Sequence, residues 1–248
     1  MRATRGQDIA MVFQNPMTSL NPVWPIGDQV SEGLRVHKAL GRAAARRAAV
    51  AILKRVGIPS AEVRVDDYPY QWSGGMMQRA VIAMAMTGSP RLLLADEPTT
   101  ALDVTIQDQI LSLLMELQRE TGMAIILVSH DMSVISETCD RVAVMYAGSI
   151  VEMGTAAAIF RAPKHPYTHG LLRSIPRLDA RLRTLTTIGG QPPDLSRIEP
   201  GCPFAPRCPV ANAECRALPI ALKTLPNGQA SACHFPERVA DLDRQFAS

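Results

Sequence analysis

The stretch Leu92-Leu93-Leu94-Ala95-Asp96-Glu97 decides the fold class of this chain, because an apolar run ends there in two adjacent carboxylates. A short apolar run of this kind predicts a buried strand. Asp96 then lies at the carboxyl end of the strand, where open α/β sheets place ligand groups. A carboxylate there can hold Mg²⁺ between two phosphates, and Glu97 can orient and deprotonate an attacking water. The stretch therefore predicts phosphate chemistry at the edge of a sheet.

Strands and helices alternate on both sides of this stretch. Short β-branched runs predict buried strands, and apolar residues three and four positions apart predict helices between them. The expected strands are residues 9–13, 92–95 and 124–128, a hairpin pairs 141–145 with 149–153, and the expected helices lie within 26–88, at about 106–121 and at 132–138. This alternation predicts an α/β fold, with a mainly parallel sheet and helices on its faces.

The composition changes beyond Gly154, where Pro, Arg and polar residues replace the periodic pattern. We therefore expect a main domain over residues 1–162, with a helical subdomain at about 26–88. A C-terminal extension over 163–248 would become a separate appendage from about Thr186.

The bulk composition of the 248 residues narrows the class of protein. Their number suits one large domain, or one with an appendage. The net charge of +3 is too small to indicate a nucleic-acid partner on its own. No apolar run approaches the roughly 18 residues of a membrane span, and no apolar segment follows the basic residues 1–8 as in a signal peptide. We therefore expect a cytosolic chain, in which disulfides are disfavoured.

Further polar residues stand where predicted elements begin or end. Gln14 follows the first strand and could reach a metal ion, and His130 follows the strand at 124–128 and could contact a γ-phosphate. Ser73-Gly74-Gly75 precedes a helix, so bare backbone N–H groups and a helix N-terminus could bind an anion. Each feature alone is more often a surface edge or a flexible turn. Their order along the chain, each at an element end, favours a functional site.

One expected part of such a site is absent from the sequence. A phosphate-binding loop of the form G-x-x-x-x-G-K-[ST] should precede all of these residues. None of the 16 glycines is followed by lysine. The loop is therefore missing rather than altered.

In this combination the chain resembles the ATP-binding subunit of an ABC transporter. The signature segment departs from the common L-S-G-G-Q at its two ends, where this chain has Trp72 and Met76. The matched segments are Gln14 for the Q-loop, residues 72–76 for the signature motif, 92–97 for the Walker B strand, Ala101-Leu102-Asp103 for the D-loop and His130 for the switch histidine.

The resemblance implies an ABC-type P-loop NTPase domain, here incomplete because the Walker A strand, loop and helix are missing. It implies ATP and Mg²⁺ as cofactors. In ABC ATPases two domains pair head to tail, and each ATP lies between the phosphate loop of one and the signature motif of the other. Carried over residue by residue, the roles are catalysis for Glu97, His130 and Gln14, Mg²⁺ binding for Asp96 and Gln14, and nucleotide contact for Ser73, Gly74, Gly75, Asp96 and Asp103.

Two further segments narrow the resemblance to one branch. Residues 16–22 (PMTSLNP) and 164–168 (KHPYT) are similar to those of the oligopeptide/dipeptide and nickel importers. The second segment could also simply pin a loop onto the domain. The branch implies ATP-driven import of short peptides, with the chain peripheral to the cytoplasmic face of the plasma membrane. Its expected partners are a second ATPase subunit in a hetero- or homodimer, transmembrane permease subunits reached through the Q-loop region and, indirectly, an extracytoplasmic peptide-binding protein; nucleic acid is not among them.

Four of the five cysteines crowd into the C-terminal part of the chain, at Cys202, Cys208, Cys215 and Cys233. In a cytosolic chain such a group indicates metal ligation before disulfides. The spacings of 5, 6 and 17 residues lack the short C-x₂₋₄-C units of structural zinc. The importer branch carries a similar pattern, which implies a [4Fe-4S] cluster. Zinc and free buried thiols stay open as alternatives.

The missing loop leads to an unusual expectation. Asp96, Glu97 and His130 would face a site that cannot grip ATP, whereas residues 73–75 could still complete the site of a partner subunit. The neighbouring strands should also show unpaired edges and an uncovered apolar face. A start codon assigned too far downstream, or a truncated gene product, would explain the loss. The alternative is a non-catalytic partner, or a regulatory iron–sulfur module, on an ABC ATPase scaffold.

Overall fold

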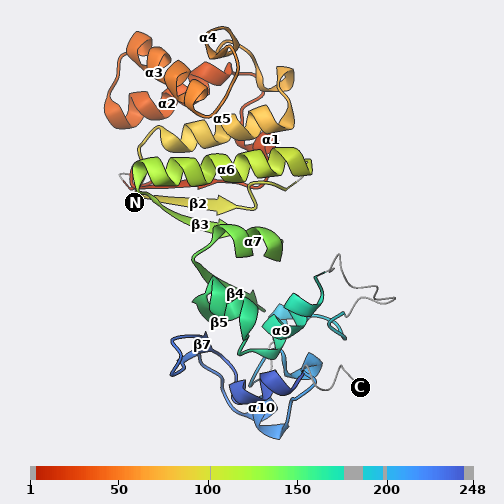
Figure 1. Cartoon of the computed structure of the whole chain (residues 1–248). Helices are drawn as coiled ribbons and strands as arrows, with labels where there is room; N and C mark the ends of the chain where they lie inside the picture. The colour runs from red at the N-terminus through yellow and green to blue at the C-terminus, as the bar shows by residue number, and fades with distance from the viewer. Residues whose placement is uncertain (1–3, 101, 176–186, 198–199, 243–248) are drawn as a thin grey trace. The chain divides into compact units, whose positions relative to one another are not determined.

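The structure is a computed structural model that describes residues 4–100, 102–175, 187–197 and 200–242. The chain divides after His130 into two compact units, which are described separately (Figure 1). No helix in these ranges combines the length and the apolar character needed to cross a lipid bilayer.

The first unit is built on a parallel sheet of three strands in the order β1-β2-β3. These are β1 (Ile9–Val12), β2 (Leu92–Asp96) and β3 (Ala124–Val128), and their positions confirm the strands expected from the sequence. Cα partners run from Ile9, Leu92 and Ala124 at one end to Asp96 and Val128 at the other. The carboxyl ends of all three strands therefore meet at one edge of the sheet.

The two faces of this sheet differ in burial. Successive side chains of a strand point to opposite faces, and one face carries the buried residues Ala10, Val12, Leu93 and Ala95. Helix α5 (Gly74–Met86) packs on β1 at this face, and Figure 1 shows α6 (Val104–Thr121) beside it. The opposite face carries exposed apolar residues of the first unit, the most exposed being Ile9, Met11, Phe13, Ile126 and Val128.

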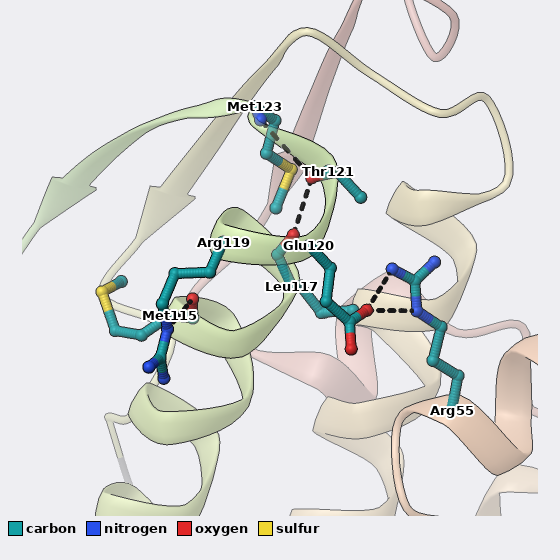
Figure 2. A network of polar contacts seen from close by, with 7 residues as sticks. All are labelled: Arg55, Met115, Leu117, Arg119, Glu120, Thr121 and Met123. Atoms are coloured by element: carbon teal, nitrogen blue, oxygen red, sulfur yellow. Dashed lines mark hydrogen bonds and ion pairs between the residues drawn. The ribbon is translucent and has the colours of Figure 1, made fainter.

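The helical part of the first unit lies between β1 and β2 in the sequence. Apolar residues at helical spacing on α3 (Arg42–Arg55), such as Ala45, Ala49 and Leu53, are fully buried and join the core. The Arg55 guanidinium donates to the Glu120 carboxylate at 2.5 and 3.0 Å and so ties α3 to the end of α6 (Figure 2). The other helices are α1 (Pro16–Ser19), α2 (Ile26–Lys38) and α4 (Ala61–Arg64), followed by a 3₁₀ turn at Pro69–Gln71.

Helix α6 has a well-defined beginning and end. Its N-cap is Asp103, whose side chain accepts the Ile106 N–H at 3.0 Å, the contact that an N-cap carboxylate makes. It ends at Gly122, which has a φ of +68° and supplies the left-handed residue that commonly closes a helix. Thr121 also stabilises this end, because its hydroxyl donates to the Leu117 carbonyl at 2.7 Å (Figure 2).

The second unit begins with α7 (Met132–Thr138) and the expected hairpin, formed by β4 (Arg141–Tyr146) and β5 (Ser149–Thr155). The antiparallel sheet continues in the order β4-β5-β7-β6. Strands β6 (Lys223–Thr224) and β7 (Ala230–Ser231) come from beyond Thr186, so the expected separate appendage shares a sheet with the hairpin. Two-residue strands are too short to show a period in the sequence. The remaining elements are α8 (Ala156–Arg161), α9 (Pro166–Arg173), α10 (Ala213–Ala217) and 3₁₀ turns at Leu195–Arg197, Ala205–Arg207 and Pro236–Asp241.

Buried polar groups join the hairpin of the second unit to the segment that follows α8. The Glu152 carboxylate on β5 is fully buried and accepts the backbone N–H groups of Lys164 at 2.6 Å and His165 at 2.9 Å. The Gln229 amide donates to Glu152 at 3.4 Å and to the Ala162 carbonyl at 3.1 Å. Burial raises the pKa of Glu152 and lowers that of His165 to about 4. The segment 164–168 is therefore pinned to the hairpin.

Candidate functional site

The three parallel strands deliver four predicted site residues to one edge of their sheet. Gln14 lies two residues beyond β1, Asp96 ends β2 and Glu97 follows it, and His130 lies two residues beyond β3. Parallel pairing brings these strand ends together, as the sequence predicted.

Glu97 is the centre of this group. Its Oε2 accepts from the Gln14 Nε2 at 2.6 Å, and its Oε1 lies 3.0 Å from the His130 Nδ1. The Thr100 hydroxyl donates to the same Oε2 at 2.8 Å. The hydrogen bonds from His130, then from Thr100, lower the pKa of Glu97 below its usual range. Glu97 is therefore an ionised carboxylate at neutral pH, the form in which it can accept a proton from water.

Asp96 and Gln14 have donor atoms that suit Mg²⁺. Asp96 ends β2 and is only partly buried, so its carboxylate can take a ligand. Gln14 uses its amide nitrogen on Glu97, which leaves its amide oxygen outside that contact. Carboxylate and amide oxygens are the ligands that this ion takes in nucleotide sites. The residues present fit the ion.

Thr100 was not among the residues predicted from the sequence. Thr100 contacts Glu97 because the chain turns after β2. In this turn the Thr100 N–H donates to the Glu97 carbonyl at 3.1 Å. A hydroxyl three residues beyond a carboxylate in a loop was the only signal available, and short motifs of that kind are too common to be specific.

The predicted signature segment lies at the start of α5 and packs against the start of α6. Ser73 is the N-cap, and its hydroxyl accepts the Met76 N–H at 3.3 Å. A Cβ at Gly75 would stand 2.8 Å from the Ile106 Cγ2, so a larger residue there would force a neighbour to shift, whereas a Cβ at Gly74 would meet its nearest atom, on Leu102, at 3.4 Å. Trp72 of this segment also donates its indole N–H to the Asp67 carboxylate at 3.0 Å, and no described hydrogen bond joins the segment to the Glu97 group.

The predicted D-loop joins β2 to α6. Ala101 lies outside the described residues; Leu102 leads into Asp103, which caps α6. The side-chain amide of Gln107 donates to the carbonyls of Thr99 at 3.2 Å and Leu102 at 3.1 Å. The loop that follows Glu97 is thus fastened to the first turn of α6.

The four clustered cysteines are free thiols that lie within electrostatic reach of one another. The Cys202 N–H donates to the Cys215 carbonyl at 2.8 Å. Burial, together with the proximity of the other three cysteines, raises the pKa of Cys233 to about 12, and burial raises that of Cys208 to about 11. Across the described parts of the chain, no group of three or more His, Cys, Asp or Glu residues is arranged to hold a metal ion. The predicted iron–sulfur cluster and its zinc alternative gain no support from this geometry.

Two family models match separate parts of the chain. A family model described as "ABC transporter" matches residues 1–100, and one described as "Oligopeptide/dipeptide transporter, C-terminal region" matches residues 151–215. A putative peptide import ATP-binding protein of Brucella melitensis is 54% identical over 239 residues, covering 94% of this chain and 71% of that protein. The chain belongs to the oligopeptide/dipeptide ABC transporter ATP-binding subunits. The family implies ATP and Mg²⁺.

Other members and relatives of this ATP-binding subunit family agree. The dipeptide transport ATP-binding protein DppD of Bacillus subtilis is 56% identical over 209 residues, or 84% of this chain, and the chain spans 62% of its length. Among solved structures, the dimeric ATP-binding cassette MJ0796 with ADP and phosphate has a TM-score of 0.55 at 29% identity, covering 62% of this chain and 66% of that one. The structure of cbiO1 of Clostridium perfringens, part of an ABC transporter complex, has a TM-score of 0.54 at 33% identity. The match covers 62% of this chain and 59% of that one. The ABC ATPase fold is therefore confirmed.

Proposed function

We propose that this chain is an ATP-binding subunit that energises ABC-type import of short peptides across the cytoplasmic membrane. The family of its relatives supports the transport role, and the convergence of Gln14, Glu97 and His130 at one sheet edge supports the chemistry. It would act on the cytoplasmic face, bound to permease subunits through the Q-loop region. An extracytoplasmic peptide-binding protein would deliver the substrate without touching this chain.

The residues at the sheet edge suit hydrolysis of a phosphoric anhydride. The ionised Glu97 carboxylate takes a proton from the attacking water, while His130 contacts its Oε1 and Gln14 donates to its Oε2. Asp96 and Gln14 would hold Mg²⁺, which offsets charge on the phosphates when it is bound with ATP. Positioning and electrostatic stabilisation account for most of the rate of such transfers.

A second part of the proposal concerns the signature segment. The sequence has no glycine followed by lysine, so nothing in it supplies the usual grip on the β- and γ-phosphates. Residues 73–75 instead present bare backbone N–H groups at the start of a thirteen-residue helix. We infer that they complete the ATP site of a second subunit.

The first test is ATP hydrolysis by the purified chain on its own, compared with Glu97→Gln. The expected result is a negligible rate in both proteins. Robust hydrolysis that Glu97→Gln abolishes would show that the chain grips ATP without a partner, and would refute the signature-donor part of the proposal.

The metal content of the cysteine group is a separate proposal. We propose a [4Fe-4S] cluster, with zinc as the alternative, from the spacing of the four cysteines and the similar pattern in the importer branch, and a regulatory iron–sulfur module would be the corresponding second function. Iron and sulfide analysis, with a visible spectrum after anaerobic purification, distinguishes these cases. Stoichiometric zinc without iron would rule out the cluster, and the absence of both metals would leave four free thiols.

A further inference from the structure

The backbone at Glu97 adopts a conformation that the surrounding loop must hold. Its φ is +45°, in the left-handed region that residues other than glycine seldom occupy. The Glu97 N–H donates to the Val128 carbonyl at 3.0 Å, which ties the residue to the end of β3, and the Glu97 carbonyl accepts the Thr100 N–H. Strained positions of this kind persist where neighbours over-determine them. The turn 97–100 is therefore a built feature of the site.

Thr100 contacts Glu97 twice. Its N–H binds the Glu97 carbonyl at 3.1 Å, and its hydroxyl donates to the Glu97 Oε2 at 2.8 Å. Together these contacts fold the carboxylate back onto its own turn, against the Gln14 amide that shares the same oxygen. Thr99, the adjacent hydroxyl residue, makes no such contact among the described residues and takes part through its backbone carbonyl.

Gln107 fastens the loop on either side of Thr100. Its amide nitrogen donates to the carbonyls of Thr99 and Leu102, one on each side of that residue. Gln107 itself lies in the first turn of α6, which Asp103 caps. Helix α6 therefore fixes the position of the loop that carries the Thr100 hydroxyl.

We propose that Thr100 is a positioning residue that sets the orientation of the Glu97 carboxylate, and that Gln107 fixes the loop carrying it. The importance for catalysis rests on the proposed role of Glu97 as the group that activates water. The positioning of the carboxylate does not depend on that role, because it is a property of the chain without nucleotide.

The test is the Glu97 side-chain rotamer, measured by NMR three-bond couplings in the full chain. Thr100→Val keeps the shape of the side chain but removes the hydroxyl, so the couplings should change from one fixed rotamer to an average. Thr100→Ser should restore the fixed rotamer, and the matched control Thr99→Val should leave it unchanged. A fixed rotamer in Thr100→Val, or the same averaging in Thr99→Val, would overturn the proposal.

Gln107→Leu provides a second, independent readout. Exchange of the Thr100 amide hydrogen should rise by about tenfold or more, because the two hydrogen bonds from Gln107 to this loop are lost. Unchanged exchange in a variant with the wild-type urea midpoint would overturn the role of Gln107. If the rotamer results hold while ATP hydrolysis never appears in any assembly, the positioning stands and the proposed function fails.

Discussion

The two units of this chain are stabilised by different kinds of interaction. In the first unit, apolar side chains from the sheet and helices form one continuous core, with Leu93, Ile110 and Leu114 fully buried. In the second, buried apolar side chains such as Ile159 and Phe204 are joined by the buried Glu152 carboxylate, which accepts the backbone N–H groups of residues 164 and 165, and by the buried His165. Cavities should therefore destabilise the first unit, and the second unit should in addition respond to pH. The predictions below test that difference.

The largest expected effect is a cavity in the first unit. Leu93→Ala removes a fully buried side chain from the covered face of the sheet and should lower the free energy of unfolding by about 2–5 kcal/mol. The matched control is Ile126→Ala on the neighbouring strand, where the side chain is 53% exposed on the other face and should cost far less. Urea denaturation measures both. Equal losses would mean that the second face is covered as well as the first.

Acid should weaken the second unit through His165. Its side chain is 1% exposed, and its pKa of about 4 lies below the ordinary 6.5, so the folded state binds fewer protons than the unfolded state. The stabilisation present above pH 6.5 is lost as pH falls towards 4, by about 3 kcal/mol. Glu152 acts in the opposite direction, because its raised pKa lets the folded state bind more protons.

The control for this pH effect is His165→Asn, since asparagine can still accept the Tyr167 N–H that the His165 Nδ1 accepts at 3.1 Å. Stability from urea denaturation between pH 7 and pH 4, followed by a probe in residues 131–242, should fall less steeply in the variant. The same slope in both proteins would assign the acid sensitivity to other groups.

A close approach in the first unit should give a smaller effect. Gly75→Ala places a methyl group 2.8 Å from the Ile106 Cγ2, an overlap that should cost about 1–3 kcal/mol. Gly74→Ala, in the same helix turn, meets its nearest atom at 3.4 Å and corrects for the helix propensity of alanine. Thermal unfolding compares the pair. If Gly75→Ala is no less stable than Gly74→Ala, the packing of α5 on α6 is looser than described.

The smallest effect is expected at an exposed ion pair. Arg46 donates to Asp66 at 2.6 Å, but both side chains are largely exposed, so Arg46→Ala should cost about 0.2–1 kcal/mol. The loss should shrink in 1 M salt, because surface charges are then screened. A loss above that range at both salt concentrations would point to a packing role of the Arg46 stem.

Much of the first unit could be predicted from the sequence, since its elements bury one apolar face each. The strand at 124–128 and the end of α6 at Gly122 follow directly from apolar periodicity and a stop signal. Parallel strands then dictate that Gln14, Glu97 and His130 meet. The contact between Thr100 and Glu97 could not be predicted. It depends on a left-handed backbone conformation at Glu97, and glutamate does not indicate such a conformation.

The second unit was less predictable for a physical reason. Its strands beyond Thr186 are two residues long, and the contacts of the buried Glu152 carboxylate with the N–H groups of residues 164 and 165 have no hydrophobic periodicity that a sequence could show. The domain boundaries proposed from composition therefore stay a prediction. The cysteine spacing suggested metal ligation, but side-chain geometry, and not spacing, decides whether four thiols form a site.

The most direct test of the central claim is ATP hydrolysis by this chain mixed with a peptide-importer ATPase subunit that has a complete phosphate loop. The account predicts that the chain stimulates hydrolysis, that Gly74→Asp abolishes the stimulation, and that Glu97→Gln leaves it intact. Gly74 suits this test because it has room for a side chain. Stimulation that survives Gly74→Asp but is lost in Glu97→Gln would contradict the account, because the chain's own sheet edge would then carry out the reaction.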